Sequence, residues 1–293
     1  MPKVAGFTFI RNAVKYDYPV VESIRSLLPL CDELVVSIGN SEDDTEKMIL
    51  GIASPKIRIV HSVWDDALRK GGRVLAVETD KAFDQVGKDA DWCIYLQADE
   101  VIHEKFYPAI RQAMEKYLDN ELVDGLLFNY LHFYASYDYT ADSRKWYSHE
   151  IRVIRNDKSI RSYGDAQGFR KNGRKLKVRP IDASIYHYGW VRHPYQQLQK
   201  INQFQRLWNE NEPNLEHIPK KDGNQFDYSE IDSLQPFLDS HPSVMQDRVE
   251  KKNWIFDFDI RKKKFRFKDR LLYWIEKKSG RRLFEYRNYI IDK

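Results

Sequence analysis

The sequence has little of several features that would settle its class at once. It has no apolar run of the roughly 18 residues that a bilayer-spanning helix needs. Its first residues, MPKVAGFTFIRN, lack the long apolar stretch of a secretory signal. It has only two cysteines, Cys31 and Cys93, and each lies beside a strand-like apolar run. We therefore expect a cytoplasmic protein whose cysteines are reduced, buried thiols rather than a disulfide or part of a metal site.

Common catalytic and nucleotide-binding motifs are also absent. The sequence contains no G-x-x-x-x-G-K-[ST] phosphate loop, no G-x-S-x-G elbow, and no CxxC or HExxH zinc spacing. The first apolar run is followed by RNAVKYDYP rather than by a G-x-G-x-x-G turn, which disfavours classical dinucleotide binding.

The positive charge is unevenly distributed. The net charge of the 293 residues is only +4, which argues against a nucleic acid partner. Residues 250–293, however, hold 15 Lys and Arg against 7 Asp and Glu, and the cations alternate with aromatic residues in DIRKKKFRFKDRLLYWIEKKSGRRLFEYRNY. Such a segment suits the surface of an anionic membrane. Alternatively, its aromatic residues dock on the rest of the protein and its lysines stay in solvent.

The first hundred residues alternate between two kinds of pattern. The apolar runs VAGFTFIRN, DELVVSIGN, KIRIVHSVW and WCIYLQADE read as strands, and the segments between them carry helical spacing. This alternation predicts an α/β fold with a Rossmann-like, mostly parallel sheet flanked by helices. Beyond about residue 121, VDGLLFNYLHFY, EIRVIRN and DASIYHYGW read as strands without long helices between them, which predicts a mixed or antiparallel extension of the sheet.

Two acids end the fourth predicted strand. Asp99 and Glu100 follow WCIYLQA, at the edge of a parallel sheet where ligands bind. Buried acids are costly unless they meet water, a cation or a partner. The pair therefore indicates either a metal site or the start of a helix over HEKFYPAIRQAMEKYL.

These segments together resemble family 2 glycosyltransferases of the GT-A fold. The resemblance lies in the Arg-Asn pair after the first strand, in DELVVSIGNSEDDT, and in DWCIYLQADE, which looks like the metal-binding Asp-x-Asp segment. Further on, EIRVIRN, IYHYGWVR and FLDSHP are similar to elements of bacterial members. The resemblance covers roughly residues 4 to 245. It implies a GT-A-like catalytic domain over residues 1–245, followed by a helical, basic appendage over residues 246–293.

The resemblance also implies an activity and a setting. The protein would move a sugar from a nucleoside diphosphate sugar to a glycan or lipid-linked acceptor, with inversion and with help from Mg²⁺ or Mn²⁺. The setting would be bacterial surface polysaccharide assembly at the inner face of the plasma membrane. A divalent cation would neutralise the departing diphosphate, with Asp99 as its leading ligand.

Other site residues follow from the same resemblance. His187 of YHYGW would be a second metal ligand, unless it is a core histidine. Glu100 would face the acceptor or bond a backbone N–H, or alternatively have a structural role. Asp165 of SYGDAQGF is the candidate general base, followed by Glu150 and Asp182. The predicted contacts of the donor, in addition to Asp99, are Arg11, Asn12, Gly39, Asn40, Asp80 and Gln97.

The sequence departs from the family pattern at several of these positions. Gln97 replaces the first acid of Asp-x-Asp, so the site has one negative charge fewer and metal binding is expected to be weak or absent. Gly39 and Asn40 stand where the family often has an acid, and Asp80 follows Thr79 where an Arg-Asn pair is common. Two alternatives therefore stay open: a nucleotidyltransferase, although RNAVKYDYP lacks the Gly- and Arg-rich loop it would need, and a non-catalytic glycan-binding or scaffold protein on a GT-A fold.

Overall fold

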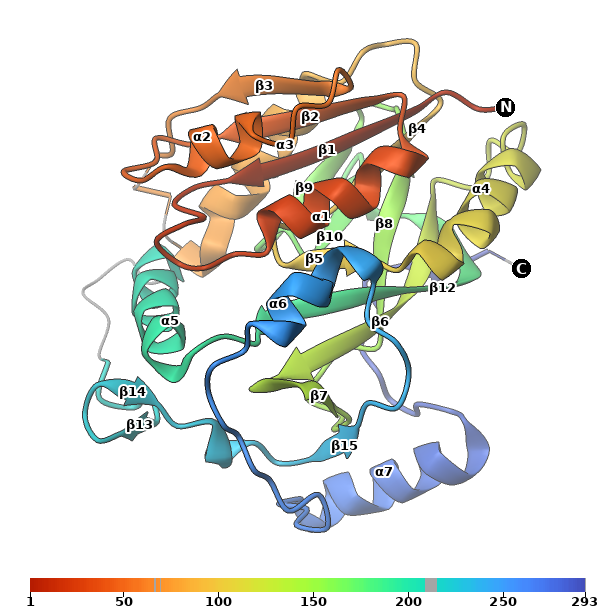
Figure 1. The fold of residues 1–293 in the computed structure, drawn as a ribbon. Helices are drawn as coiled ribbons and strands as arrows, with labels where there is room; N and C mark the ends of the chain where they lie inside the picture. The colour runs from red at the N-terminus through yellow and green to blue at the C-terminus, as the bar shows by residue number, and fades with distance from the viewer. Residues whose placement is uncertain (66, 69, 209–214, 293) are drawn as a thin grey trace.

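The amino-terminal part of the chain forms the parallel sheet that the sequence predicts (Figure 1). The computed structural model describes all residues except 66, 69, 209–214 and 293. Four strands lie in the order β3-β2-β1-β4 and all pair in parallel. They are β1 (Val4–Ile10), β2 (Glu33–Ile38), β3 (Ile57–His61) and β4 (Trp92–Tyr95), and the helices between them are α1 (Val20–Leu27), α2 (Thr45–Leu50) and α3 (Arg73–Asp84).

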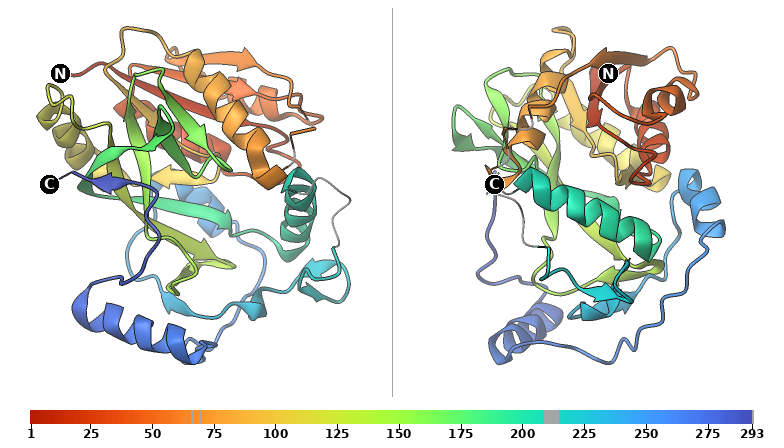
Figure 2. Two further views of the ribbon diagram at one scale, coloured as in Figure 1. Left: turned by 180° about the vertical axis from the view of Figure 1, so that it is seen from behind. Right: turned by 90° about the vertical axis from the view of Figure 1, so that its left-hand side faces the viewer.

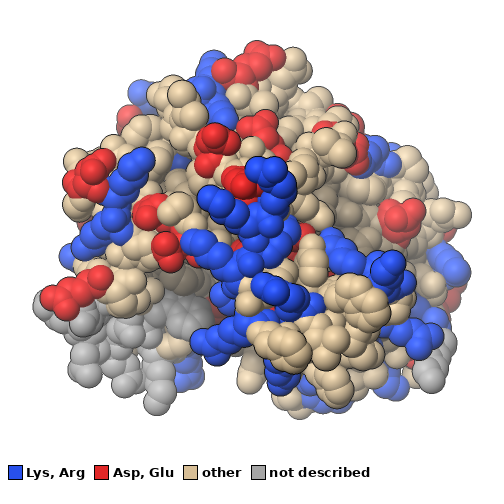
Figure 3. Space-filling model, turned by 90° about the horizontal axis from the view of Figure 1, so that it is seen from below, with Lys and Arg blue, Asp and Glu red and all other residues tan. Residues whose placement is uncertain are grey.

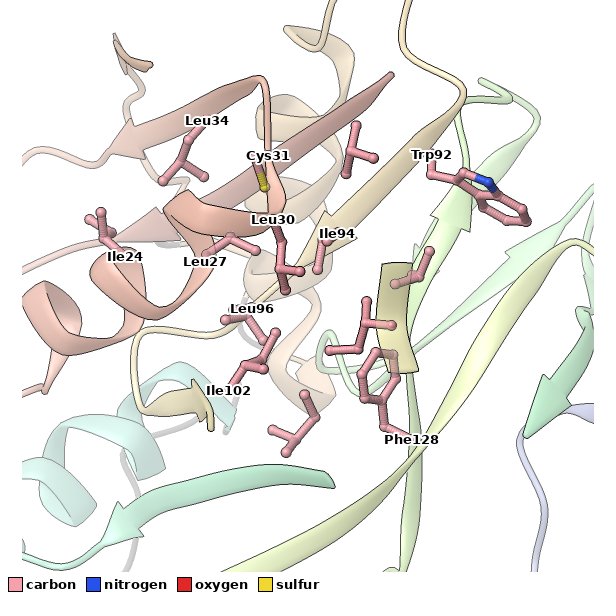
Figure 4. Close-up of a cluster of buried hydrophobic side chains, with 14 of the residues drawn as sticks. Ile24, Leu27, Leu30, Cys31, Leu34, Trp92, Ile94, Leu96, Ile102 and Phe128 are labelled. Atoms are coloured by element: carbon pink, nitrogen blue, oxygen red, sulfur yellow. The ribbon is translucent and has the colours of Figure 1, made fainter. Parts of the chain in front are cut away.

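Strand β1 is buried along its whole length, because both faces of this sheet are covered. Val4 and Ile10 point to the side of α1, where Ile24 and Leu27 pack with the buried side chains drawn in Figure 4. Ala5, Phe7 and Phe9, which alternate with them along β1, point to the opposite side, which α3 covers (Figure 2). Cys31 and Cys93 are buried free thiols, as predicted.

The extension of the sheet is mixed, as the sequence also predicts. Strand β8 (His149–Arg155) pairs antiparallel with β4 and with β6 (Gly125–Tyr134). The long strand β12 (Lys177–Trp190) runs parallel to β6 and antiparallel to β5 (Glu100–Ile102). Strands β7 (Ser136–Ala141) and β15 (Leu234–Pro236) complete this edge, and two small sheets are formed by β9 (Ile160–Tyr163), β10 (Gly168–Lys171) and β11 (Arg174–Lys175), and by β13 (Lys220–Lys221) and β14 (Gln225–Phe226).

The segment after Asp99 differs from the expected helix start. The chain first forms strand β5, and helix α4 (Tyr107–Lys116) begins only after a short 3₁₀ helix, η3 (Glu104–Phe106), whose N-cap is His103. Asp99 therefore caps no helix, and the capping interpretation of this acid is wrong. The other 3₁₀ helices are η1 (Leu28–Leu30), η2 (Lys70–Gly72), η4 (Tyr228–Glu230) and η5 (Ser243–Met245).

The carboxyl-terminal third wraps around the sheet extension (Figures 1 and 2). Helix α5 (Pro194–Trp208) follows β12, and α6 (Gln246–Glu250) packs near α1. Helix α7 (Phe267–Ser279) lies at the bottom of Figure 1, and the chain then returns to the sheet, where β16 (Ile290–Ile291) pairs with β12. In the described part of the chain, no helix is long and apolar enough to cross a membrane.

Candidate functional site

A cavity of about 630 Å³ opens at the carboxyl ends of β1, β4 and β12. This volume falls within the range of roughly 300–1,000 Å³ that is common for ligand pockets. Aromatic side chains form much of the wall: Phe9, Tyr16, Tyr18, Trp64, Trp146, Tyr147, Trp190 and Phe204. Six of the predicted site residues also line it, namely Arg11, Asn12, Gln97, Asp99, Asp165 and His187. The fold therefore brings residues from distant parts of the sequence to one place.

Asp99 is a largely buried residue of the cavity lining. Its backbone carbonyl accepts a hydrogen bond from Tyr188 N at 2.8 Å, which ties the turn after β4 to β12. Its Oδ2 is 3.0 Å from Lys200 Nζ, and its Oδ1 is 3.8 Å from His187 Nε2. Burial alone would raise the pKa of Asp99, but the nearby positive charges, that of Lys200 first, outweigh it and hold the pKa below the usual range. Asp99 is therefore an ionised, fixed carboxylate.

Lys200 is one of the residues that sequence reasoning missed at this site. It lies on α5, its side chain is 13% exposed, and its Nζ donates to Asp99 Oδ2 and, at 2.9 Å, to the carbonyl of Gly189. Burial, with Arg192 nearby, lowers the pKa of Lys200 to about 8, and Asp99 offsets part of that effect. The ammonium is therefore mostly charged at pH 7. No spacing in the sequence links positions 99 and 200, since only the packing of α5 brings them together.

Gly189 makes room for this convergence. A Cβ at this position would lie 2.4 Å from His187 Nε2 and 2.7 Å from Asp99 Oδ2. Both distances are far shorter than a van der Waals contact, so any side chain at position 189 would displace the imidazole and the carboxylate.

His187 is paired with a second histidine, His132 on β6. The two Nδ1 atoms are 3.2 Å apart, and His132 Nε2 is 3.0 Å from the carbonyl of Tyr147. Burial lowers the pKa of both rings, so both are neutral near pH 7. Since the carbonyl only accepts, we assign the proton of His132 to Nε2, and His187 then donates from Nδ1. This leaves the Nε2 lone pair of His187 on the side of Asp99.

The arrangement is a poor fit for a divalent cation. Asp99 and His187 are the two predicted ligands, and the described residues contain no group of three His, Cys, Asp or Glu side chains able to hold a metal. In addition, the ammonium of Lys200 already binds the carboxylate. A divalent ion on Asp99 about 4 Å from this ammonium would be repelled by about 8 kcal/mol at an effective dielectric constant of about 20. Gln97, at the position of the missing acid, donates from Nε2 to the carbonyl of Ala166 at 3.3 Å.

Glu100 does not line the cavity and is fully buried. Arg152 donates to it twice, from Nε to Oε2 at 2.7 Å and from Nη2 to Oε1 at 2.5 Å. Glu100 Oε2 also accepts from the backbone N–H of Gln97 at 3.1 Å. Glu100 thus bonds a backbone N–H, and it is not among the residues that line the cavity. The acid closes the turn that carries Asp99.

The two candidate bases have different surroundings. Asp165 lies between β9 and β10, is half-buried and lines the cavity, and burial raises its pKa. Glu150 on β8 is buried outside the lining. Burial raises the pKa of Glu150 to about 8, although Arg152 opposes the shift. A carboxyl group that is protonated at neutral pH is a poor general base. Asp182 is exposed on β12 and does not line the cavity.

The remaining predicted donor contacts meet at one aromatic residue, Trp64, which sequence reasoning did not single out. The Arg11 guanidinium is 5.6 Å from the centre of the Trp64 ring. The ring occupies the space that a Cβ of Gly39 would need, and Asn40 Oδ1 accepts a hydrogen bond from the backbone N–H of Trp64. Gly39 and Asn40 do not line the cavity themselves, but both contact Trp64, which does.

Asn12 and Asp80 have mainly structural bonds. Asn12 has a positive φ of 56° and its Oδ1 accepts from the backbone N–H of Glu42, which fixes the loop after β1 at the edge of the cavity. Asp80 on α3 accepts from the backbone N–H of Ser162 at 2.7 Å. Because Asp80 is not among the residues that line the cavity, the structure does not bring it to the other predicted donor contacts.

No family model matches the sequence, and no curated protein does. Similar solved structures include TarS 1–349 from S. aureus, also solved in complex with UDP, with 11% identity and a TM-score of 0.36 over 70% of this chain and 65% of that one. Glucosyl-3-phosphoglycerate synthase from Mycobacterium tuberculosis, solved with Mn²⁺, UDP and phosphoglyceric acid, has 21% identity and a TM-score of 0.30 over 45% of this chain and 43% of that one. A third, 4-diphosphocytidyl-2C-methyl-D-erythritol synthase from Anaerococcus prevotii, has 11% identity and a TM-score of 0.35 over 53% of this chain and 72% of that one.

The chain thus spans less than two thirds of the length of the first of these structures. All three TM-scores are below 0.5, so these likenesses carry no conclusion about the function of this chain.

Proposed function

We propose that the protein is a glycosyltransferase that moves a sugar from a nucleoside diphosphate sugar to a glycan or lipid-linked acceptor, with inversion. The observation that supports this most is the make-up of the cavity at the carboxyl edge of the parallel sheet. It combines a buried ammonium held by Asp99 with a separate carboxylate, Asp165, and with broad aromatic walls. Open α/β sheets bind their ligands at this edge.

Each part of the cavity matches one part of the reaction. The ring of Trp64 offers a surface on which a base can stack, and Arg11 beside it adds positive charge for phosphate oxygens. Asp165 takes the proton from the acceptor hydroxyl while the oxygen of that hydroxyl attacks the anomeric carbon. The bond from that carbon to the diphosphate oxygen breaks, and its electron pair leaves with the nucleoside diphosphate.

The binding of Mg²⁺ or Mn²⁺ stays a prediction, and the sequence allows two outcomes, of which weak binding is the first and no binding is the second branch. The ammonium on Asp99 and the neutral Gln97 support the second branch. No step of the mechanism above requires a metal.

A donor screen tests the proposed function. The protein is incubated with UDP-, GDP- and dTDP-sugars, with and without Mn²⁺, and the released nucleoside diphosphate is measured. We expect slow release from at least one donor, because water can replace the acceptor at Asp165. Release of pyrophosphate from a nucleoside triphosphate and a sugar phosphate would instead identify a nucleotidyltransferase. No release, together with no calorimetric binding of UDP or GDP, would identify a non-catalytic scaffold.

We further propose that α7 binds the surface of an anionic membrane, where a lipid-linked acceptor would be met. Phe267, Leu271 and Trp274 form a stripe at helical spacing and are 87%, 51% and 58% exposed. The other side of the helix is tied to the protein, since Tyr273 Oη bonds Asp142 at 2.5 Å and Glu276 pairs with Arg144 at 2.7 Å. Lys and Arg side chains are frequent on the face of the molecule shown in Figure 3. Helix α7 itself carries Lys268, Arg270, Lys277 and Lys278, and Lys277 Nζ donates to Gln235 Oε1 at 3.2 Å.

Charge supports a lipid surface over a protein partner, because cations flank the apolar stripe on both sides. Binding of this kind would put the protein at the inner face of the plasma membrane, a location that stays a prediction. The boundary predicted at residue 245 stays a prediction, and the following segment contacts the rest of the protein through Trp254 Nε1, which donates to the carbonyl of Ala135 at 2.7 Å.

Sedimentation with vesicles tests the membrane proposal. We expect the protein to bind vesicles containing an anionic lipid and to bind neutral vesicles at least about tenfold more weakly, since each cation near the surface contributes about 1 kcal/mol. Replacing Phe267, Leu271 and Trp274 together by serine should abolish binding. Ile255→Ser, at a site that is 95% exposed but outside α7, is the control and should bind normally. Equal binding by the triple variant, or no binding by the wild type, would contradict the proposal.

A further inference from the structure

We propose that Lys200 supplies the positive charge that the sequence assigns to a divalent cation, so that the nucleoside diphosphate binds and departs without a metal. This inference rests on the proposed function, because it concerns how the same cavity holds the diphosphate. It names a further residue of the site and its ligand group, a phosphate oxygen of the diphosphate.

The contacts of the ammonium carry the inference. Among the described residues, Lys200 Nζ donates to Asp99 Oδ2 at 3.0 Å and to the carbonyl of Gly189 at 2.9 Å. A lysine ammonium has three donors, so one remains for a ligand in the cavity, which Lys200 lines. Asp99 and Gly189 thus fix the position of the charge, and Asp99 is a positioning residue for Lys200 rather than a group that must touch a metal.

A second cation beside Lys200 adds to the positive charge. Arg192 is fully buried, and its Nη1 donates to the carbonyl of Gly189 at 2.8 Å and to Gln197 Oε1 at 3.2 Å. Its Nε and Nη2 are buried without a hydrogen-bond partner among the described residues. The ring of Tyr18 lies against both cations, 5.2 Å from the guanidinium carbon of Arg192 and 4.9 Å from Lys200 Nζ.

The charges at this end of the cavity do not cancel. Asp99 contributes one negative charge, whereas Lys200 and Arg192 contribute two positive charges, and the neutral ring of His187 adds none. Buried cations with unused donors leave a net positive field that favours an anion. A diphosphate brings negative charge to this field and an acceptor oxygen for the third donor of Lys200, whereas Arg192, which does not line the cavity, contributes through its charge.

The same arrangement accounts for the departure of the diphosphate. When the bond to the anomeric carbon breaks, the electron pair stays on the bridging phosphate oxygen, and the added negative charge lies near the fixed ammonium. Donors that are already oriented toward developing charge stabilise it without reorganisation. No proton has to leave Lys200 in this step, so the lysine is unchanged at the end of the reaction.

Calorimetric titration of UDP and GDP into chelator-treated protein tests the inference. The wild type should bind one of them in EDTA, and saturating Mn²⁺ should change its Kd less than threefold. Lys200→Met keeps the length of the side chain and removes the charge, and it should weaken binding about 10- to 100-fold, as expected for the loss of a charge-assisted hydrogen bond. Lys200→Arg should retain part of the affinity. Lys251→Met, at an exposed position on the surface, is the control and should bind as the wild type does.

A double variant guards against misfolding. Lys200→Met leaves Asp99 buried without its partner, so Asp99→Asn/Lys200→Met is tested beside it, and thermal unfolding confirms that both are folded. Binding by the wild type that requires Mn²⁺, or binding by folded Lys200 variants that equals the wild type, would overturn the inference and leave the proposed function intact. A wild type that binds neither nucleotide with or without metal would overturn both.

Discussion

Replacing Arg152 by methionine should lower the free energy of unfolding by about 3–5 kcal/mol, because it leaves the buried Glu100 carboxylate without a cation and with hydrogen bonds only from Tyr130 Oη and Gln97 N. Both side chains are completely shielded from solvent and are joined by two short hydrogen bonds. The guanidinium also lies against two rings, 5.5 Å from that of Tyr95 and 5.6 Å from that of Tyr130. Methionine conserves most of the volume, so the loss reports mainly the unpaired charge.

Chemical denaturation measures this loss, and two further variants interpret it. Arg161→Met removes an exposed pair with Asp84, in which both side chains are more than 40% exposed, and should cost less than about 1 kcal/mol. Glu100→Gln combined with Arg152→Met removes both charges and should recover a substantial part of the stability. If the free energy of unfolding of Arg152→Met equals that of the wild type, the ion pair between Arg152 and Glu100 does not stabilise the turn that carries Asp99.

Replacing Asp165 by asparagine should lower kcat roughly 100- to 10,000-fold while changing the Kd of the nucleoside diphosphate little, because a general base contributes in this range and does not bind the leaving group. The side chain lines the cavity, and asparagine has nearly the same shape. The measurement is steady-state turnover with the donor that the screen identifies. Asp182→Asn and Glu150→Gln are matched controls, because the first side chain is exposed and the second is buried and protonated at neutral pH.

The dependence of the rate on pH should identify the base. A base must be deprotonated, so kcat/KM falls as the pH drops through its pKa. Burial raises the pKa of Asp165, so the fall should occur above the ordinary range of an aspartate, and it should vanish in Asp165→Asn. A fall that persists in Asp165→Asn, or a loss of activity in Glu150→Gln equal to that of Asp165→Asn, would assign the base to another carboxylate.

The sequence was sufficient to predict the parallel sheet and the edge at which the cavity opens. Strands β1 to β4 are short apolar runs that end in polar residues, and the carboxyl ends of parallel strands meet at one edge. For this reason Asp99 is predicted to lie at this edge, whereas the family resemblance assigns Arg11, Asn12 and Gln97 to the donor site. The three residues of β5 were not predicted, because so short a strand has no periodicity of its own and forms only by pairing with β12. The helix expected directly after Asp99 was therefore placed too early.

Lys200, His132 and Trp64 could not be found in the same way. Each lies at the cavity because elements distant in the sequence pack together. Lys200 is there because α5 packs against the end of β12, and His132 because β6 pairs with β12. Trp64 is there because the loop after β3 packs against Phe9 of β1. A lysine on an amphipathic helix usually points to solvent, and only the structure shows that this one lies under Asp99. The tail illustrates the same point, since Trp254 docks on the protein while Trp274 of α7 does not.

The most direct test of the central claim is a crystal structure of the protein soaked with UDP or GDP in the presence of EDTA. We expect the diphosphate in the cavity with an oxygen about 3 Å from Lys200 Nζ, and the nucleoside beside Trp64 and Arg11. Nucleotide bound at another place on the protein, or a cavity that stays without nucleotide at saturating concentration, would contradict the account.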